Sequence, residues 1–539
     1  MKFSKLAVFG LMTLLGGGFS ARAVAQPTAE NLRDFDYIKG SDGWLTSYNA
    51  AGLLSLPVTS TSVVEASFGK NNGKFVNYYQ SDDSYDFGLQ TESFYKLSPK
   101  VALYGNVSYN NFRGRNMTGS SFVDPYYNLF DIVEADPGRL GKKQKETYHL
   151  VGGIGFRVFR GLSLGAKVDY TAANYAKMRD LRHVNSLLDL TLTAGASYCF
   201  NKVVDLGVSY FYRRSVESVK FQLSGEAGKL YESLISYGAF YGMYETFIGE
   251  SGYASSAAQP MFNRFHGGSL QLNLRFSPRV SWFSELTYKG RTGYYGEKSS
   301  KTVTFAEHDA TIYEYSGQLS VRKAGTLHTL KVGVAYEDGT NDQNIYKMTD
   351  GSSGGGNSVV EYFGSNEVVS RQTLNGKAVY TLNLGVRDYQ PAWVLKAGAD
   401  LWTRDMKVSV YPYYRKHSTT SAQGYVSALR NIISGRNMYS VRLAAGYGFG
   451  NGTRSNDGLY AAPSESQKPP KESAYYLNRE FEYLTASRVN AGIGFRYSRF
   501  FKKGFTGYVA ADYDFTKAFD VHYLGSSAGV FVLKVGCSF

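Results

Sequence analysis

Apolar and polar residues alternate at every second position along most of the chain from residue 62 onwards. Residues 270–276 show the pattern clearly, because four apolar side chains alternate there with Gln271, Asn273 and Arg275. A β-strand sends successive side chains to opposite faces, so each such stretch predicts a strand with one apolar and one polar face. Similar stretches occupy residues 101–110, 162–171, 188–198, 439–449, 488–498 and 509–516. Soluble β-sandwiches and membrane-spanning barrels share this alternation.

The lengths of the connections separate these two fold classes. The short turns are residues 97–100, 159–161, 201–202, 277–279, 324–325, 390–392 and 502–504, and the long loops include 114–145, 224–262 and 339–366. Short turns at one end and long loops at the other are typical of outer-membrane barrels, whereas a sandwich has no reason to sort its connections this way. The sequence therefore predicts an all-β fold, a transmembrane antiparallel β-barrel of roughly 16–18 strands with short periplasmic turns and long extracellular loops.

Two segments precede the predicted barrel, which we expect to span residues 62–539. Residues 1–25 have a basic start at Lys2 and Lys5, an apolar run and small residues before Gln26, as in a secretory signal peptide. An uncleaved membrane anchor is the alternative, but the apolar run is shorter than the roughly 20 residues that a membrane span needs. Residues 26–61 form an N-terminal periplasmic entry segment in this interpretation, too short for a plug domain of the TonB-dependent type.

Composition agrees with a barrel that meets lipid. The chain has 45 Tyr, 34 Phe and 59 Gly, and barrels use aromatic residues at both membrane–water boundaries. The formal net charge of +14 comes from scattered residues without a nucleic-acid-binding motif, so we expect lipopolysaccharide phosphates or an anionic solute rather than nucleic acid. Cys199 and Cys537 fall on opposite faces of distant strands, which predicts neither a disulfide nor a metal site.

The polar faces of the predicted strands supply candidate lumen-lining residues of both charges. An ion-selective constriction and a lumen filled by paired charges with no pathway are both compatible with this set. The candidates are Lys167, Asp169, Asp189, Arg275, Glu285, Arg442, Arg488, Arg496, Asp512 and Asp514, together with Arg213, Lys289, Lys331, Arg387 and Lys534.

Two long loops are unusually aromatic for segments exposed to water. Such a surface is unfavourable unless it folds inward or meets a partner. A constriction loop inside the barrel, an external binding platform and packing against a neighbouring loop are the alternatives, and we favour inward folding. Part of residues 230–243 also has spacing compatible with a helix, despite its glycines. The residues concerned are Tyr126, Tyr127, Phe130, Tyr231, Tyr237, Phe240, Tyr241 and Tyr244.

Enzymatic activity finds no support in the sequence. None of the seven histidines lies at a spacing that forms a nucleophile–base pair on a strand, and neither a Gly-x-Ser-x-Gly elbow nor a His-Glu-x-x-His motif occurs. We therefore expect no catalytic residues, no metal and no cofactor.

Three stretches resemble known outer-membrane proteins. The last strand, with Phe531, Leu533, Val535 and Phe539 on one face, resembles the assembly signal of bacterial outer-membrane barrels, which implies recognition by the barrel-assembly machinery. Asn49-Ala50-Ala51 is similar to the Asn-Pro-Ala turn of fatty-acid-transporter-like barrels, although the proline is missing.

The third resemblance lies in the first long loop. Residues 124–138, which begin Asp-Pro-Tyr-Tyr and end Ala-Asp-Pro-Gly, and the following Lys-Glu-Thr-Tyr of residues 145–148 resemble a Bacteroidetes family of outer-membrane barrels without assigned function. The resemblance extends over the mature chain and implies a barrel and an outer-membrane address, but no catalytic or binding residue. Such barrels often accompany TonB-dependent receptors and surface lipoproteins, which makes either a candidate partner.

Three functions follow as hypotheses. The first is a channel or accessory component for uptake of a small solute, with loops gating the lumen. The second is a non-conducting outer-membrane scaffold that binds a secretion component or a surface lipoprotein. The third is a membrane hydrolase.

Overall fold

A single antiparallel sheet of 18 strands closes on itself, because β22 pairs with both β21 and β1. The computed structural model describes residues 33–224, 229–299, 302–349, 359–501 and 504–539. The barrel strands are β1 (Ser60–Gly73), β2 (Asp83–Ser98), β3 (Val101–Met117), β5 (Gly141–Phe159), β6 (Leu162–Lys177), β7 (Arg182–Cys199), β8 (Val204–Gln222), β11 (Gln259–Ser277), β12 (Val280–Gly296), β13 (Thr304–Lys323), β14 (Thr326–Thr349), β15 (Val359–Leu384), β16 (Trp393–Val410), β17 (Tyr413–Ser434), β18 (Asn437–Leu459), β20 (Arg488–Phe501), β21 (Phe505–Ala518) and β22 (Ser527–Ser538).

The two faces of the barrel wall differ as the alternation predicts. Leu270 is 63% exposed on the outside, whereas its neighbour Gln271 is 2% exposed and faces inward. Apolar side chains that point outward and polar ones that fill the interior are the arrangement of a barrel surrounded by lipid. The predicted transmembrane antiparallel barrel is confirmed, and its strand number lies at the upper end of the predicted range.

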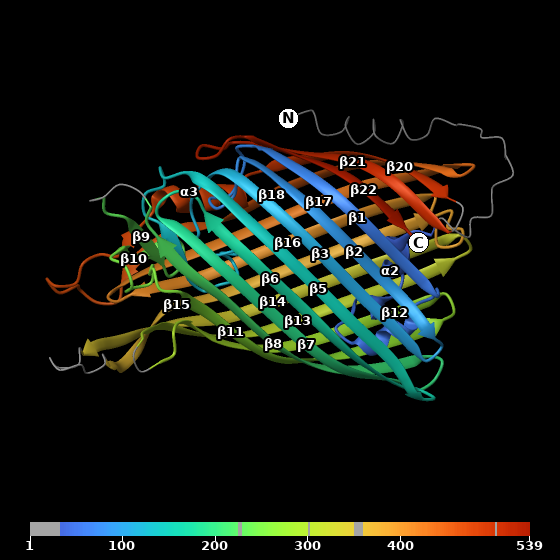
Figure 1. The fold of residues 1–539 in the computed structure, drawn as a ribbon, viewed down its shortest axis with the longest axis horizontal. Coiled ribbons are helices and arrows are strands. Elements are labelled where there is room, and N and C mark those ends of the chain that lie inside the picture. The colour runs from blue at the N-terminus through green and yellow to red at the C-terminus, as the bar shows by residue number, and fades with distance from the viewer. Residues whose placement is uncertain (1–32, 225–228, 300–301, 350–358, 502–503) are drawn as a thin grey trace.

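The short turns and long connections lie at opposite ends of the barrel (Figure 1). The prediction of a long loop over residues 339–366 is wrong for the described part, because β14 continues to Thr349 and β15 begins at Val359. The resulting rim is uneven: β14 and β15 have 24 and 26 residues, whereas β20 and β22 have 14 and 12. Residues 1–25 and the turn residues 502–503 lie outside the described part.

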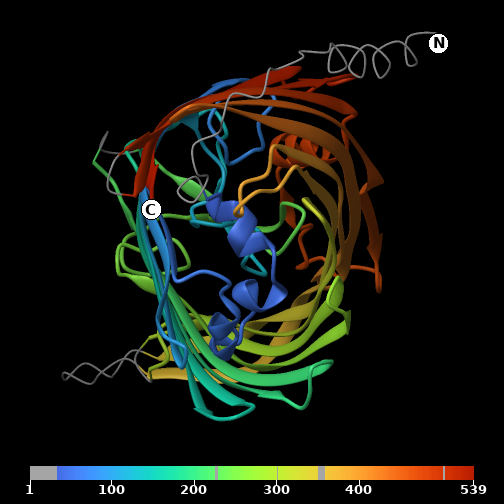
Figure 2. The same ribbon diagram turned by 90° about the vertical axis from the view of Figure 1, so that its right-hand side faces the viewer.

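The N-terminal insert, residues 33–58, lies inside the barrel at the short-turn end (Figure 2). It consists of α2 (Phe35–Gly40) and the 3-10 turns η2 (Gly43–Thr46) and η3 (Ala50–Ser55). The periplasmic entry segment predicted over residues 26–61 therefore reaches into the lumen from residue 33, and its last two residues already belong to β1, which begins at Ser60. Apolar side chains such as Ile38 and Leu53 pack together and against the wall residue Phe94, and this burial holds the segment in the lumen.

The loop cap closes the other end of the lumen. It comprises residues 118–139, which contain β4 (Asp131–Glu134); residues 231–256, which contain β9 (Glu232–Ser236) and β10 (Tyr241–Thr246); β19 (Lys471–Glu472); and α3 (Ala474–Thr485). The four short strands form a second sheet in the order β19-β10-β9-β4. Buried apolar side chains join this sheet to the wall strands β15 and β16. The two inserted parts therefore lie at opposite ends of one barrel (Figure 1).

The helical interpretation of residues 230–243 is wrong. Gly238, Ala239 and Phe240 have φ angles of 145°, 46° and 51°, which turn the chain back into the β9–β10 hairpin. Among the described residues, no helix is long and apolar enough to cross a membrane.

Candidate functional site

Glycines on the inner wall make the seat of the N-terminal insert. A Cβ atom added at Gly165 lies 2.1 Å from the Ala51 amide nitrogen, and one at Gly155 lies 2.5 Å from the Ala50 carbonyl oxygen. No real side chain tolerates such distances, so the backbone of η3 lies directly against the wall. Asn49 fixes the contact, because its Nδ2 donates to the Ala196 carbonyl oxygen at 2.8 Å while its Oδ1 accepts from the Ala51 amide.

Tyr48 joins the insert to charged residues on the neighbouring wall strands β12 and β13. Its amide donates to Glu285 at 3.1 Å, and its hydroxyl donates to Glu314 Oε2 at 3.1 Å. Lys289 donates to Glu314 Oε1 at 2.6 Å and to the Tyr48 hydroxyl at 2.9 Å. Burial raises the pKa of the Tyr48 hydroxyl, which is therefore neutral at physiological pH. These bonds hold the Tyr48 side of the insert against β12 and β13.

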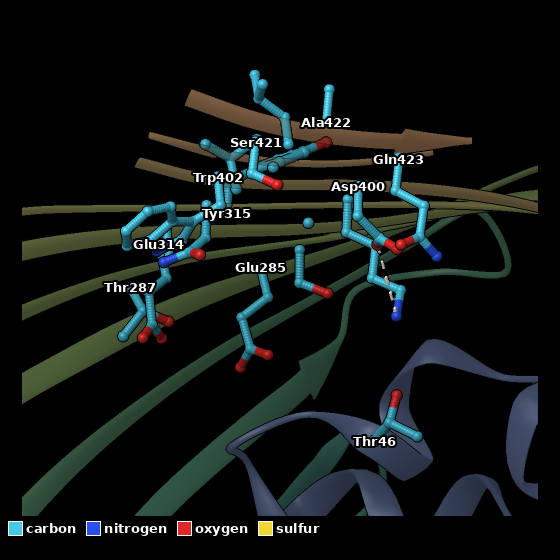
Figure 3. A pocket seen from close by; sticks show the side chains of 18 of the residues that line it. Thr46, Glu285, Thr287, Glu314, Tyr315, Asp400, Trp402, Ser421, Ala422 and Gln423 are labelled. Atoms are coloured by element: carbon cyan, nitrogen blue, oxygen red, sulfur yellow. Dashed lines mark ion pairs between the residues drawn. The ribbon is translucent and has the colours of Figure 1, made fainter. Parts of the chain in front are cut away.

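A chamber of about 600 Å³ lies directly above the insert. Thr46 and Tyr48 form its floor, and Figure 3 shows Glu285, Glu314 and Trp402 projecting into it from the wall strands. Asp400 forms an ion pair with Lys377 at 3.8 Å on another side of the chamber. The lining thus combines charged side chains of both signs with apolar and aromatic surface, and the charged groups can orient a small polar solute.

A second cavity of about 310 Å³ adjoins the chamber on the side of the loop cap. The two share Glu314, Asn375 and Trp402 among their lining residues. Tyr126 and Tyr127 of the cap line the second cavity, and four arginines of the wall face them. The arginines are Arg213, Arg291, Arg371 and Arg404, from β8, β12, β15 and β16.

The loop cap is tied to the wall by buried polar contacts. Glu134 and Lys177 form an ion pair in which neither side chain is more than 7% exposed. Lys143 donates to the Ser120 carbonyl oxygen at 2.7 Å. Burial raises the pKa of Asp131 to about 7, although that carboxyl group accepts a hydrogen bond from Ser120 Oγ at 2.6 Å. The cap is therefore held by groups whose removal from water is costly unless they stay paired.

The predicted lumen residues of the strands lie on the inner side of the wall but do not form one site, whereas Arg387 lies in the turn between β15 and β16. Glu285, Lys167 and Arg488 lie near the chamber, since Glu285 and Arg488 line it and Lys167 lies 5.6 Å from the Tyr48 ring. The others make separate contacts: Asp169 with His149, Asp189 with Arg213, Arg275 with Asp205, Arg442 with Asp512 and Asp514, and Arg496 with the Tyr508 ring.

Sequence reasoning missed Lys377 and Asp400 of the chamber and five charged wall residues of the adjoining cavity. Alternation is the signal that could have found Arg291, which lies two positions after Lys289 on the same face of β12. The remaining four cavity residues lie in long strands whose alternation is weak. They are Glu314, Glu337, Arg371 and Arg404.

The aromatic loop residues lie within the cap, folded inward. Tyr231, Tyr237, Phe240 and Tyr241 are buried in its apolar core with Phe130, and Tyr244 packs at its edge. Tyr126 and Tyr127 face the second cavity.

The apolar face of the last strand points outward. The exposed fraction of its side chains rises from 39% at Phe531 and Leu533 to 53% at Val535, and the terminal Phe539 is 57% exposed. Lys534 points inward and pairs with Glu65 at 3.0 Å. Among the described residues, no group of three or more His, Cys, Asp and Glu side chains is arranged to hold a metal ion.

A closed antiparallel barrel with an apolar exterior and a polar interior defines the class of outer-membrane-type β-barrels. Within that class, the chain belongs to a family of unknown function, DUF6850, whose model matches residues 50–539. A search of curated protein sequences found none that matches this chain.

Solved barrel structures resemble the chain at low identity. The outer-membrane transporter YddB of Escherichia coli has 8% identity and a TM-score of 0.38, with 88% of this chain and 81% of that chain covered. BauA, the ferric preacinetobactin receptor of Acinetobacter baumannii, has 10% identity and a TM-score of 0.36, with 88% and 80% covered. The toluene transporter TodX of Pseudomonas putida has 10% identity and a TM-score of 0.27, with 95% and 99% covered. The likeness is limited to barrel architecture.

Proposed function

We propose that this protein is an outer-membrane channel for uptake of a small polar solute, gated at both ends of its lumen. The supporting observation is the chamber of about 600 Å³ between the N-terminal insert and the loop cap. A lumen that holds only structural charge pairs has no need of a hollow compartment, lined by charged and aromatic side chains, between two inserts. Solute enters when the cap moves and leaves towards the periplasm when the insert moves.

The proposal includes a location in the outer membrane and a route of assembly. Residues 1–25 direct export, and the outward apolar face of β22 with the terminal Phe539 is the signal read by the barrel-assembly machinery. Lipopolysaccharide surrounds the finished barrel. A TonB-dependent receptor or a surface lipoprotein is the candidate partner at the long-loop end, in keeping with the Bacteroidetes-type motif of residues 124–138.

Single-channel conductance of the refolded mature protein in a planar bilayer tests the proposal. We expect rare discrete openings in the wild type. Gly165→Val, which removes the seat of the insert, and the double substitution Tyr126→Ala with Tyr127→Ala, which loosens the cap, each make openings more frequent, and together they do so more than either alone. Folded barrels that stay silent in all four forms overturn the channel.

A non-conducting scaffold is the second candidate, favoured by the buried ion pairs that fix the loop cap, such as Glu134–Lys177. In this function the cap holds a secretion component or a surface lipoprotein on its outer side. Silent bilayers together with copurification of one defined partner, lost when residues 231–256 are shortened, support the scaffold. Conductance that rises with insert removal contradicts it.

A further inference from the structure

Three residues of the loop cap contact a cluster of arginine side chains on the barrel wall. The Tyr127 carbonyl oxygen accepts a hydrogen bond from Arg291 Nη1 at 2.8 Å, and the Asn128 carbonyl oxygen accepts one from Arg371 Nη1 at 2.7 Å. The Tyr126 ring lies 5.5 Å from the Arg404 guanidinium carbon. The cap therefore presents oxygen atoms and aromatic faces where the guanidinium groups gather.

The Tyr127 ring covers two further guanidinium groups. Its centroid lies 4.6 Å from the Arg291 guanidinium carbon and 5.3 Å from that of Arg213. Cation–π contacts of this kind are weak relative to a charged hydrogen bond. An oxyanion binds a guanidinium group more strongly than an aromatic ring does, so it can displace the ring from the arginine.

The arginines are incompletely neutralised by the protein. Arg213 pairs with Asp189 and Arg404 with Glu480, whereas Arg371 and Arg291 share Glu337 at 2.9 and 3.7 Å. The four guanidinium groups thus have three carboxylates between them.

The other two carboxylates that line this cavity do not neutralise the fourth arginine. Glu314 is bound by Lys289, and Asp124 is exposed and accepts from the Tyr126 amide of its own loop.

Several arginine N–H groups lack an acceptor. Within the described residues no hydrogen-bond acceptor reaches Arg291 Nη2, Arg371 Nε or Arg404 Nε, and these three side chains are 1%, 9% and 7% exposed. A buried donor without an acceptor is unfavourable, and a charged donor more so. Closing the cap leaves these donors unpaired, and an acceptor-rich group that displaces the cap would pair them.

We propose that Arg213, Arg291, Arg371 and Arg404 bind the carboxylate or phosphate group of the solute, and that residues 126–128 hold this site while the cap is closed. The inference rests on the proposed function and adds the class of solute. Because the site lies inside the lumen and not at the outer surface, its ligand is a water-soluble anion and not a lipid headgroup. Binding of the anion and opening of the cap are then one competition for the same donors.

Calorimetric titration of inorganic phosphate into the full mature protein, refolded in detergent in a phosphate-free buffer, tests the site. We expect saturable binding of phosphate and none of glucose at the same concentration. Tyr127→Ala uncovers two arginines and tightens binding about tenfold. Arg371→Gln removes a charged donor and weakens it at least about tenfold. Arg275→Gln, whose arginine pairs with Asp205 at the short-turn end, leaves binding unchanged.

Hydrogen exchange gives a second readout: phosphate accelerates exchange in residues 122–130 of the wild type. Should Arg371→Gln fail to fold, Tyr127→Ala decides the matter alone. Folded wild type and Tyr127→Ala that bind no phosphate, or that bind glucose equally well, overturn the arginine site. Phosphate binding by a protein that never conducts overturns the channel function but keeps the arginine site. Conductance without phosphate binding overturns the arginine site but keeps the channel function.

Discussion

Arg404 of β16 and Glu480 of α3 form a doubly hydrogen-bonded ion pair inside the barrel, with distances of 3.1 Å from Nη1 to Oε1 and 2.8 Å from Nη2 to Oε2. Both side chains are less than 10% exposed. The pair lowers the pKa of Glu480 despite burial, so the carboxylate stays charged. It is the buried ion pair between α3 and β16, and Glu482 of the same helix adds hydrogen bonds from the Tyr523 and Leu524 amides.

Loss of one partner should release α3. Glu480→Gln leaves Arg404 without its charge partner, at a cost of about 3–5 kcal/mol to docking of the helix. Hydrogen exchange within residues 474–485 should therefore accelerate, while exchange in β16 changes little.

Glu465→Gln, at an exposed position, is the matched control and should leave exchange of α3 unchanged. Replacing both partners, Arg404→Met with Glu480→Leu, should destabilise α3 less than Glu480→Gln alone, because no buried charge is left unpaired. Equal exchange of α3 in wild type and Glu480→Gln would contradict a role for the pair.

A side chain at Gly165 should expel the N-terminal insert. Gly165→Val places carbon where the Ala51 amide lies, and overpacking of this kind costs about 1–3 kcal/mol. We expect faster hydrogen exchange in residues 43–56 without loss of the folded barrel. Gly152→Val on β5 is the control, since a Cβ there meets none of the described atoms within 4 Å. The seat is misassigned if both variants behave alike.

Docking of the loop cap should weaken as pH rises. The pKa of Asp131 is raised by burial from 3.8 to about 7, so between these values the docked cap retains a proton that the undocked cap releases. Docking is therefore unaffected by pH below about 4, loses stability as pH rises to about 7, and levels off above it. Exchange of residues 131–134, corrected for the intrinsic pH dependence, should show more protection at pH 5 than at pH 8.

Asp131→Asn cannot ionise and should remove most of this pH dependence. The buried asparagine still accepts a hydrogen bond from Ser120 through its side-chain oxygen. The same change of protection with pH in wild type and variant would assign the effect to another group.

The last strand should tolerate charge on one face only. Leu533→Arg puts a cation against lipid and costs about 2–4 kcal/mol near the bilayer midplane. Lys534→Leu loses only the inner ion pair with Glu65. Folding yield in liposomes should fall more for Leu533→Arg, and equal yields would contradict the assignment of the two faces.

The sequence predicts the barrel but not its contents, and the reason is physical. Leu533 and Lys534 are adjacent in a strand, so their side chains point to opposite faces, and the alternation of apolar and polar residues shows this in the sequence. The seat of the insert depends on Gly165 and Ala51, which are far apart in sequence and carry no periodic signal. The Arg404–Glu480 pair joins residues 76 positions apart for the same reason. Inward folding of Tyr126 and Tyr127 was predictable because exposed aromatic surface is costly, but their arginine partners were not.

Because the rim is uneven, the sides of the barrel differ in height within the plane of the membrane. β15 has 26 residues and β20 has 14, so the wall differs by about 40 Å in strand length at roughly 3.3 Å per residue. The height of the wall that the barrel presents therefore depends on direction within the membrane plane, low across β20–β22 and high across β14 and β15.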